Sequence, residues 1–306
     1  MVALWRPRTQ VNQLAIQRFQ YKPLEGQHVT ILTFSLLVWV GALVAGFLGA
    51  LTGLGGGVVL VPLLALGFGV NIRYAIGASL VSVIATSSGA AAAYVKEGYT
   101  NIRIGMFLEI ATTVGALVGA FLATKLPVAV IAVIFGLVLL YSAILSGRPR
   151  HEHAETGPTD PWATCLKLHG AYPTASGLQP YQVRAVPLGF SLMFGAGVLS
   201  GLLGIGSGAA KVLAMDQAMR IPFKVSTTTS NFMIGVTAAA SAGVYLHRGY
   251  IDPGLAMPVM VGVLMGSMLG ARVLVGARTQ VLRLLFSSII VIIGFEMIYK
   301  GITGSF

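Results

Sequence analysis

Four ionisable side chains lie inside long apolar stretches of the sequence: Glu109, Lys211, Asp216 and Glu296. A charge in the membrane interior is costly, so such residues are rare and are candidates for carrying protons or for contacting a charged substrate. Lys211 could be the counter-charge for an anion, with Asp216 as its partner, and Glu109 and Asp216 are the candidates for proton coupling. The alternative is that a side chain reaches out to the membrane surface, which we expect for Glu296 and leave open for Lys211.

Glycines interrupt two apolar stretches, at LTGLGGGVVLVP (residues 51–62) and LLGIGSGAAKVL (residues 202–213). Glycine adopts backbone conformations that other residues avoid, so a membrane helix can stop and restart there if its freed backbone groups find a partner. A restarted helix offers unpaired N–H groups and the positive end of its dipole, so two restarts predict an anion site. The candidate residues are Gly53, Gly55, Gly56, Gly57, Gly204, Gly206, Ser207 and Gly208. The alternative is that these glycines only allow close helix packing.

A helix rich in hydroxyl groups is expected after each break, as in STTTSNFMIGVT (residues 226–237). Hydroxyl and amide groups can replace the water around an oxyanion without adding a full charge. The candidates are Ser79, Thr86, Ser230, Asn231 and Thr237. Asn231 is the strongest single candidate, because an amide inside the membrane is costly unless its hydrogen-bonding groups are used. The hydroxyls could instead form hydrogen bonds between helices.

The sequence offers little for other kinds of chemistry. It contains no G-x-x-x-x-G-K-[ST] loop, so we expect no ATP site, and no polar stretch long enough for a catalytic domain, so we expect no enzyme. His151, His153 and His169 share the central linker with Cys165, the only cysteine, but they lack the spacing of metal ligands. We therefore predict no metal site and no other cofactor.

The composition places the chain in a membrane. Apolar residues make up 56% and charged residues 9% of the sequence, whereas soluble domains carry about 25% charged residues. The apolar stretches are rich in Ala, Leu and Gly without alternation, which favours helices over barrel strands. The net charge of +11 comes from Lys and Arg between the apolar stretches. It therefore predicts anchoring at the lipid bilayer and not a nucleic-acid partner.

We expect an all-α integral membrane protein whose chain divides into four segments: a cytosolic tail (1–28), transmembrane repeat 1 (29–146), a linker loop (147–184) and transmembrane repeat 2 (185–306). Each repeat is predicted to hold about four full spans and a short half-helix after its glycine break.

The short segments, near 57–70 and 208–221, reach only about 21 Å, less than the roughly 30 Å of a bilayer core. If they do not cross, 12 of the 20 Lys and Arg lie on the side of the N-terminal tail. If they cross, 8 lie there, the halves are inverted and the linker lies on the other side. The charge rule therefore favours eight full spans with both ends in the cytoplasm.

The two halves are similar in sequence. Residues 46–120, aligned without gaps on residues 197–271 at an offset of 151, share 17 identities, many of them glycines. Internal symmetry of this kind is common in secondary transporters. The paired G-x-x-x-G motifs at 115–119 and 266–270 are expected to serve close helix packing.

These motifs resemble those of the TauE/SafE sulfite-exporter family, also called the TSUP family. The resemblance rests on GFLGALTGLGGGVVLVPLLALG (46–67), GASLVSVIATSSGAAAAY (77–94) followed by Gly98-Tyr99, GVLSGLLGIGSG (197–208) and VSTTTSNFMIGVTAAASAGVYLHRGYIDP (225–253). It covers nearly all of the chain from residue 30 to residue 300. It implies a multi-pass protein of the cell membrane, in bacteria the plasma membrane, that transports sulfite, sulfoacetate and related sulfur oxyanions or organosulfonates. Ser207 replaces a glycine of the family pattern and Lys211 stands where the first half has Leu60, which bears on the substrate and not on the architecture.

We therefore expect a secondary transporter that exports a small sulfur-containing anion, such as sulfite or an organosulfonate, from a site between the two breaks. A negative charge moving outward gains about 2.3 kcal/mol per 100 mV of interior-negative potential, so a coupled proton is not required. The alternatives are a transporter or channel for another small solute and an intramembrane enzyme. A cation channel would need acidic rings that the sequence lacks, and an enzyme would need more reactive side chains inside the membrane. The sequence indicates no oligomeric state.

Overall fold

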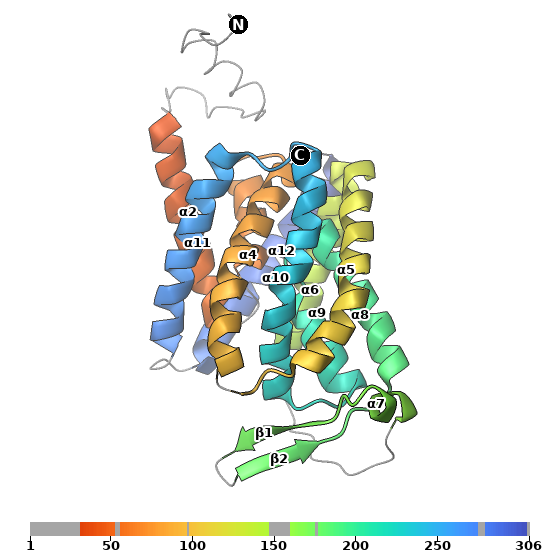
Figure 1. The fold of residues 1–306 in the computed structure, drawn as a ribbon. Helices are drawn as coiled ribbons and strands as arrows, with labels where there is room; N and C mark the ends of the chain where they lie inside the picture. Colours follow the sequence, from red (N-terminus) through yellow and green to blue (C-terminus); the bar gives the residue numbers. More distant parts are fainter. Residues whose placement is uncertain are drawn as a thin grey trace, which may run out of the picture.

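The structure, a computed structural model, describes residues 31–52, 56–96, 98–146, 160–174, 177–274 and 279–304; the predicted tail, residues 1–28, lies outside them. Long helices stand side by side in a bundle, with a β-hairpin at one end (Figure 1). The first half contains α2 (Ile31–Thr52), α3 (Gly57–Pro62), the π-helix η1 (Leu63–Gly67), α4 (Ile72–Lys96), α5 (Ile102–Lys125) and α6 (Val128–Ser146). The linker contains α7 (Pro161–Cys165), β1 (Gly170–Thr174) and β2 (Gly177–Tyr181). The second half contains α8 (Val186–Leu203), α9 (Gly208–Leu213), the π-helix η2 (Ala214–Ala218), α10 (Phe223–His247), α11 (Pro253–Leu274) and α12 (Thr279–Thr303).

Large apolar side chains face outward on the long helices. Leu32, Met106 and Ile292 are 79%, 63% and 66% exposed, which would be unfavourable in water and suits contact with lipid. Among the described helices, α2, α5, α8 and α11 are long and apolar enough to cross a membrane. The hydroxyl-rich helix α10 instead packs against α4 inside the bundle. The predicted class, a helical multi-pass membrane protein, is therefore confirmed.

Each glycine break turns the chain back along the long helix that precedes it. The ring of Phe68, directly after η1, lies 6.2 Å from the ring of Phe34 at the start of α2. In the second half, the Arg184 N–H donates to the Met219 carbonyl, so the residue after η2 lies beside the start of α8. Thus α2 with α3 and η1 forms one helical hairpin, and α8 with α9 and η2 forms another.

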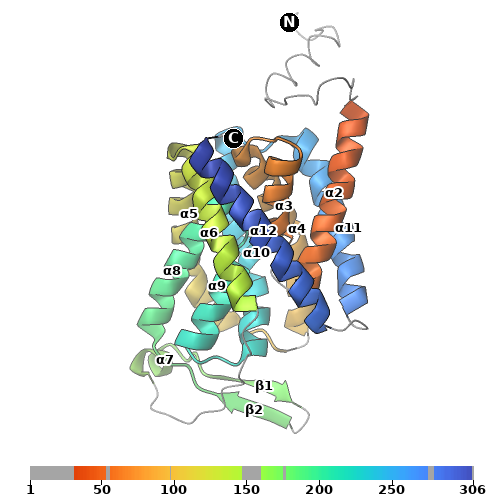
Figure 2. The same ribbon diagram turned by 180° about the vertical axis from the view of Figure 1, so that it is seen from behind.

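The hairpins place the linker opposite the start of α2. In Figures 1 and 2 the start of α2 and the C-terminus lie at one end of the bundle, and β1 and β2 lie at the other. The expectation that the linker lies at the same end as the start of α2 is therefore wrong. The short segment is too short to span a bilayer, as predicted, because α3 and η1 have only 6 and 5 residues. However, a short segment that folds back along α2 still returns the chain to the end where α2 began.

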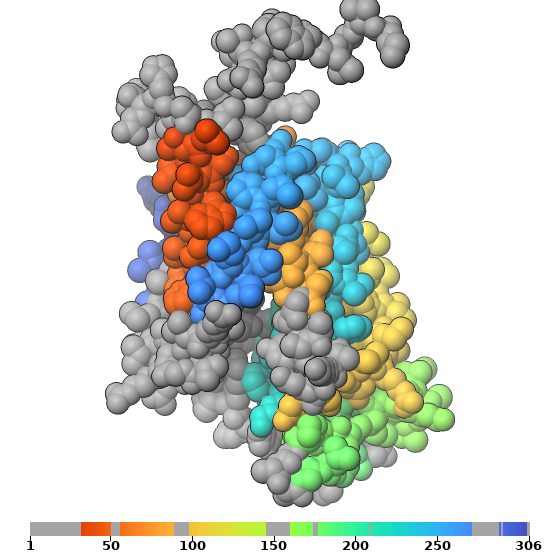
Figure 3. Space-filling view, turned by 60° about the vertical axis from the view of Figure 1, so that its left-hand side comes forward, coloured from red at the N-terminus to blue at the C-terminus, as the bar shows by residue number. Residues whose placement is uncertain are grey.

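The most extensive helix contacts join the two halves of the chain. Helix α2 packs on α11, α5 on α8, α6 on α12 and α4 on α10. Figure 3 shows α2 and α11 side by side on one face of the molecule. Each half therefore completes its packing only with the other half.

Glycines allow these helices to touch backbone to backbone. A Cβ atom added to Gly115 or Gly119 of α5 would lie 2.2 or 2.0 Å from the carbonyl oxygen of Phe194 or Val198 in α8. One added to Gly266 of α11 would lie 2.0 Å from a backbone carbonyl oxygen of α2. Ordinary contact begins at 3.4 Å, so no larger residue fits without moving a helix. The packing role predicted for these motifs is confirmed at Gly115, Gly119 and Gly266.

The linker contains more structure than the predicted loop. Strands β1 and β2 pair antiparallel, with Gly170 opposite Tyr181. The Asn101 side chain, which caps the start of α5, donates to the Tyr181 hydroxyl at 2.6 Å and ties the hairpin to the bundle. Burial raises the pKa of Tyr181. Each strand contains a proline, which argues against strand structure when the sequence is read alone.

Candidate functional site

The two glycine breaks meet inside the bundle. The Ser79 hydroxyl on α4 donates to the Gly204 carbonyl of the second break at 2.8 Å. A Cβ atom on Gly57, the first residue of α3, would lie 3.2 Å from the same carbonyl and 2.8 Å from Ser79 Oγ. This contact is too close for a solute to lie between Gly57 and Gly204. Binding between the breaks therefore requires the two hairpins to move apart.

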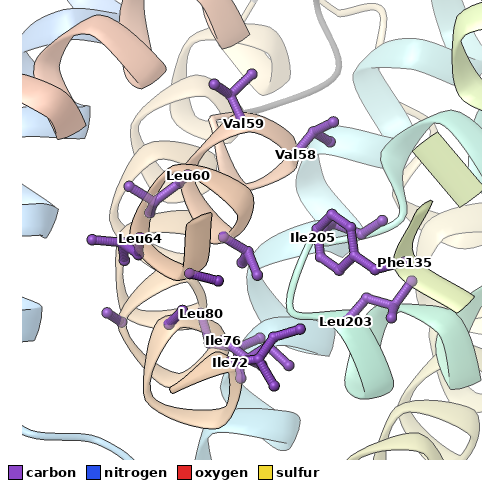
Figure 4. Close-up of a cluster of buried hydrophobic side chains, with 14 of the residues drawn as sticks. Val58, Val59, Leu60, Leu64, Ile72, Ile76, Leu80, Phe135, Leu203 and Ile205 are labelled. Carbon is purple, nitrogen blue, oxygen red and sulfur yellow. The ribbon is translucent and has the colours of Figure 1, made fainter. Parts of the chain in front are cut away.

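Apolar side chains surround this junction on the side of α3. Val58 and Leu60 are buried, and Val58 belongs to the same cluster of buried side chains as Ile205 of the second break (Figure 4). Residues 56–62 of the first break therefore offer backbone groups but no polar side chain. The predicted residues Gly53 and Gly55 lie outside the described residues.

The second break is built on a left-handed backbone. Gly204 and Gly206 have φ angles of 67° and 71°, and Ser207 has a φ of 46° although it carries a side chain. Ser207 is 5% exposed, and its hydroxyl has no hydrogen-bond partner among the described residues. The Ser230 hydroxyl donates to the Gly208 carbonyl at 3.3 Å, which holds the start of α9 against α10. Strained backbone with an unpartnered buried hydroxyl is typical of functional positions.

Lys211 lies one helical turn beyond Ser207 and is 0% exposed. Its ammonium group donates to Thr237 Oγ1 at 2.5 Å, and the Thr237 hydroxyl donates to Glu109 Oε1 at 2.7 Å. Lys211 Nζ also lies 4.0 Å from Glu109 Oε2. The three side chains come from α9, α10 and α5. Glu109, Thr237 and Lys211, called here the buried network, thus join both halves of the chain and carry no net charge.

Two further hydroxyls hold the Glu109 carboxylate. Thr112 donates to Oε2 and Thr113 to Oε1, each at 3.0 Å. Three hydroxyl donors and a nearby ammonium group thus surround the two carboxylate oxygens. Thr112 and Thr113 are not among the residues predicted from the sequence. The available signal was their spacing, because residues three and four positions after Glu109 share its face of a helix.

The remaining predicted residues are not part of this network. The structure pairs Lys211 with Glu109 instead of the expected Asp216, which is buried in η2. The Thr86 hydroxyl donates to the Ser82 carbonyl of its own helix at 3.0 Å. Asn231 is half-buried on α10. Among the described residues, no three His, Cys, Asp or Glu side chains gather as a metal site would require.

Comparison with known proteins assigns the chain to a family. The model of the family described as sulfite exporter TauE/SafE matches residues 38–297. The "Probable membrane transporter protein YunE" of Bacillus subtilis is 28% identical over 283 residues, which are 89% of this chain and 99% of that protein. The "Probable membrane transporter protein MJ0441" of Methanocaldococcus jannaschii is 27% identical over 282 residues, 88% of this chain and 96% of that protein. No solved structure matches the chain significantly. Since the family match spans most of its length, this multi-pass membrane protein belongs to the TauE/SafE family, a family of membrane transporters and not of enzymes.

Proposed function

We propose that this protein is a secondary transporter that exports a small sulfur-containing anion, such as sulfite or an organosulfonate. The observation that carries the proposal is Lys211, a completely buried cation one turn beyond the second glycine break. The family description supports sulfite as one substrate, whereas the relatives' names state only membrane transport. An interior-negative potential supplies about 2.3 kcal/mol per 100 mV for each net negative charge that leaves.

The anion binds at Lys211 and Ser207, with help from backbone N–H groups at the two breaks. A lysine ammonium has three N–H donors, and Thr237 is the one hydrogen-bond acceptor of Lys211 among the described residues. The buried Ser207 hydroxyl offers another donor. Because Gly57 and Gly204 touch, solute binding separates the two hairpins, and this separation is the opening movement of the transport cycle. Ser79 and Ser230, which fix the breaks to α4 and α10, position the site.

We also propose that the two halves are copies of one unit that face in opposite directions. At the offset of 151, Gly46 corresponds to Gly197, and Thr112 to Val263. A Cβ atom on Gly46 would lie 2.4 Å from the Val263 carbonyl oxygen, and one on Gly197 would lie 2.2 Å from the Thr112 carbonyl oxygen, so the contacts correspond as well. The corresponding helices α2 and α8 begin at opposite ends of the bundle (Figures 1 and 2). Inverted repeats support alternating access, because the two halves can exchange conformations and so open the site to the other side of the membrane.

Flux through the purified protein in liposomes tests the transport proposal. We expect efflux of radiolabelled sulfite that a potassium diffusion potential accelerates and that isethionate, an organosulfonate, inhibits. Lys211→Met should raise the KM for the anion at least tenfold, whereas Lys300→Met, which removes a half-exposed lysine of α12, should leave it unchanged. In a carrier of a neutral or cationic solute, the Lys211 substitution should leave the KM for that solute unchanged. If no sulfur anion moves or competes, the proposed substrate class is wrong.

A further inference from the structure

The buried network suggests how transport is coupled, an inference that rests on the anion site proposed above. We propose that an anion takes Lys211 from Glu109 only when Glu109 accepts a proton, so that one proton crosses the membrane with each anion. The proton comes from water on the side where the anion enters and leaves to water on the side where the anion is released. No bond other than the O–H bond of Glu109 forms or breaks.

Charge balance is the first argument. Lys211 is fully buried and Glu109 is 8% exposed, so neither charge is screened by water. The pair is neutral as it stands, and a monoanion bound beside it would leave one uncompensated negative charge inside the protein. Buried charges are tolerated only when they are paired. A proton on Glu109 restores neutrality and frees Lys211 for the anion.

The hydrogen bonds of the network allow this exchange. Thr237 has one hydroxyl hydrogen and two acceptors within reach, Glu109 Oε1 at 2.7 Å and the Met233 carbonyl at 2.9 Å. When Glu109 is protonated, Thr237 can donate to Met233 and accept from the Glu109 O–H group. Thr112 likewise has a second acceptor, the Glu109 backbone carbonyl at 3.2 Å. Neutralising Glu109 therefore leaves these two hydroxyls with partners.

The ionisable groups on the helices around Glu109 show which of them can influence its proton exchange. Helix α8, which packs along α5, contains no ionisable residue. Helix α10 carries Lys224 and His247 near its two ends, both exposed, and the buried Tyr245, whose hydroxyl donates to the Gly201 carbonyl. The short segment of α9 and η2 contributes Lys211 and, five residues on, the buried Asp216. Lys211 is the ionisable group that the structure places against the Glu109 carboxylate.

The network exists in one half-site only. At the positions 151 residues away, the other half carries Leu60, Thr86 and Met260. The cation and the acid are both replaced by apolar residues there, and only the threonine is kept. The acid and the lysine are absent together, as expected for a pair that acts as a unit, because either one alone would be an unpaired buried charge. Of the two corresponding positions, only one therefore holds a coupling centre, and the proposed cycle carries one proton.

The proposal makes the effect of voltage depend on the charge of the solute. A monoanion that travels with one proton moves no net charge, whereas a dianion with one proton moves a single negative charge. Isethionate is a monoanion at neutral pH, and sulfite is partly a dianion. Isethionate flux should therefore follow the pH gradient and ignore the membrane potential. Sulfite flux should respond to both.

The decisive experiment measures isethionate flux in liposomes that contain a pH-sensitive dye. In the wild-type protein we expect one proton per isethionate and a less than twofold response to a diffusion potential. Glu109→Gln should abolish the proton movement and make isethionate accumulation depend on voltage, up to about 50-fold per 100 mV. Glu296→Gln, the same change at a half-exposed acid of α12, should behave like the wild type.

Two results of the flux measurements would contradict the proposed proton coupling. Voltage-driven isethionate flux without protons in the wild type contradicts it, and so does unchanged proton coupling in Glu109→Gln. If the Glu109→Gln protein does not fold, the wild-type protein in unbuffered detergent solution decides, because isethionate binding should then take up about one proton per protein. No proton uptake on binding would refute the exchange. If neither sulfite nor isethionate moves or competes, the transport proposal itself fails instead.

Discussion

Two acid–lysine pairs of similar geometry differ in their surroundings, and this difference predicts their contributions to stability. Lys211 Nζ and Glu109 Oε2 are 4.0 Å apart, with side chains 0% and 11% exposed. Lys300 Nζ and Glu296 Oε1 are 3.6 Å apart, with side chains 32% and 47% exposed. For the first pair, Coulomb's law at an effective dielectric constant of about 20 gives about 4 kcal/mol. For the second, an exposed pair one helical turn apart contributes about 0.3–0.5 kcal/mol.

A double-mutant cycle at each pair measures these values. Glu109→Gln or Lys211→Met should lower the free energy of unfolding by about 3–5 kcal/mol, because each leaves a buried charge without its partner. The double variant should regain about 2–4 kcal/mol of the summed loss, because both charges are then gone. The same cycle with Glu296→Gln and Lys300→Met should show a coupling below about 0.5 kcal/mol. Equilibrium unfolding in detergent micelles at pH 7 supplies all of these values.

The refuting result is additivity at the buried pair. If the losses from Glu109→Gln and Lys211→Met simply add in the double variant, the two charges do not interact and the network is not an ion pair. The pair on α12 serves as the control, because its shorter distance would give the stronger coupling if distance alone decided. A larger coupling at α12 than at the buried pair would therefore refute the reasoning from burial.

Two further predictions concern helix packing and the linker hairpin. Gly115→Ala should lower the free energy of unfolding by about 1–3 kcal/mol, because its Cβ would lie 2.2 Å from a carbonyl oxygen of α8. The control Gly195→Ala has open space around its Cβ and should not be destabilising. Thermal unfolding in detergent compares the two variants. Tyr181→Phe removes the hydrogen bond from Asn101 and should cost about 1 kcal/mol at neutral pH in the same assay. Burial disfavours the ionised hydroxyl of Tyr181 and so raises its pKa, and the wild-type protein should therefore lose stability as the pH rises above about 10, where tyrosine in the unfolded chain ionises. The Phe variant should lose less, and an equal loss in both would contradict the assignment.

The features that could be predicted from the sequence are those set by local physical chemistry. Gly204 and Gly206 predicted a break in the helix, because few other residues adopt positive φ. The spacing of Gly115 and Gly119 predicted close helix packing. Lys211 was a candidate because a lysine in an apolar stretch is energetically costly and is therefore rare without a function. Each of these signals lies within a few residues along the chain.

The features that could not be predicted depend on contacts between distant segments. Glu109 and Lys211 belong to different halves, and only the packing of α5, α9 and α10 brings them together. The direction in which the short segments run depends on contacts such as the one between Phe34 and Phe68, which length and charge counts do not contain. The linker strands are set by their attachment to the bundle through Asn101.

The exchange of helices between the halves has a consequence for synthesis in the cell. Gly46 of α2 rests on the backbone of Val263 in α11, 263 − 46 = 217 residues later in the chain. At about 5–20 residues per second, the ribosome needs roughly 10–40 s to make the partner after α2 has emerged. Until then the bare backbone at this glycine faces lipid or the insertion machinery. Helices can enter the membrane one by one, but the final bundle can close only when translation is nearly finished.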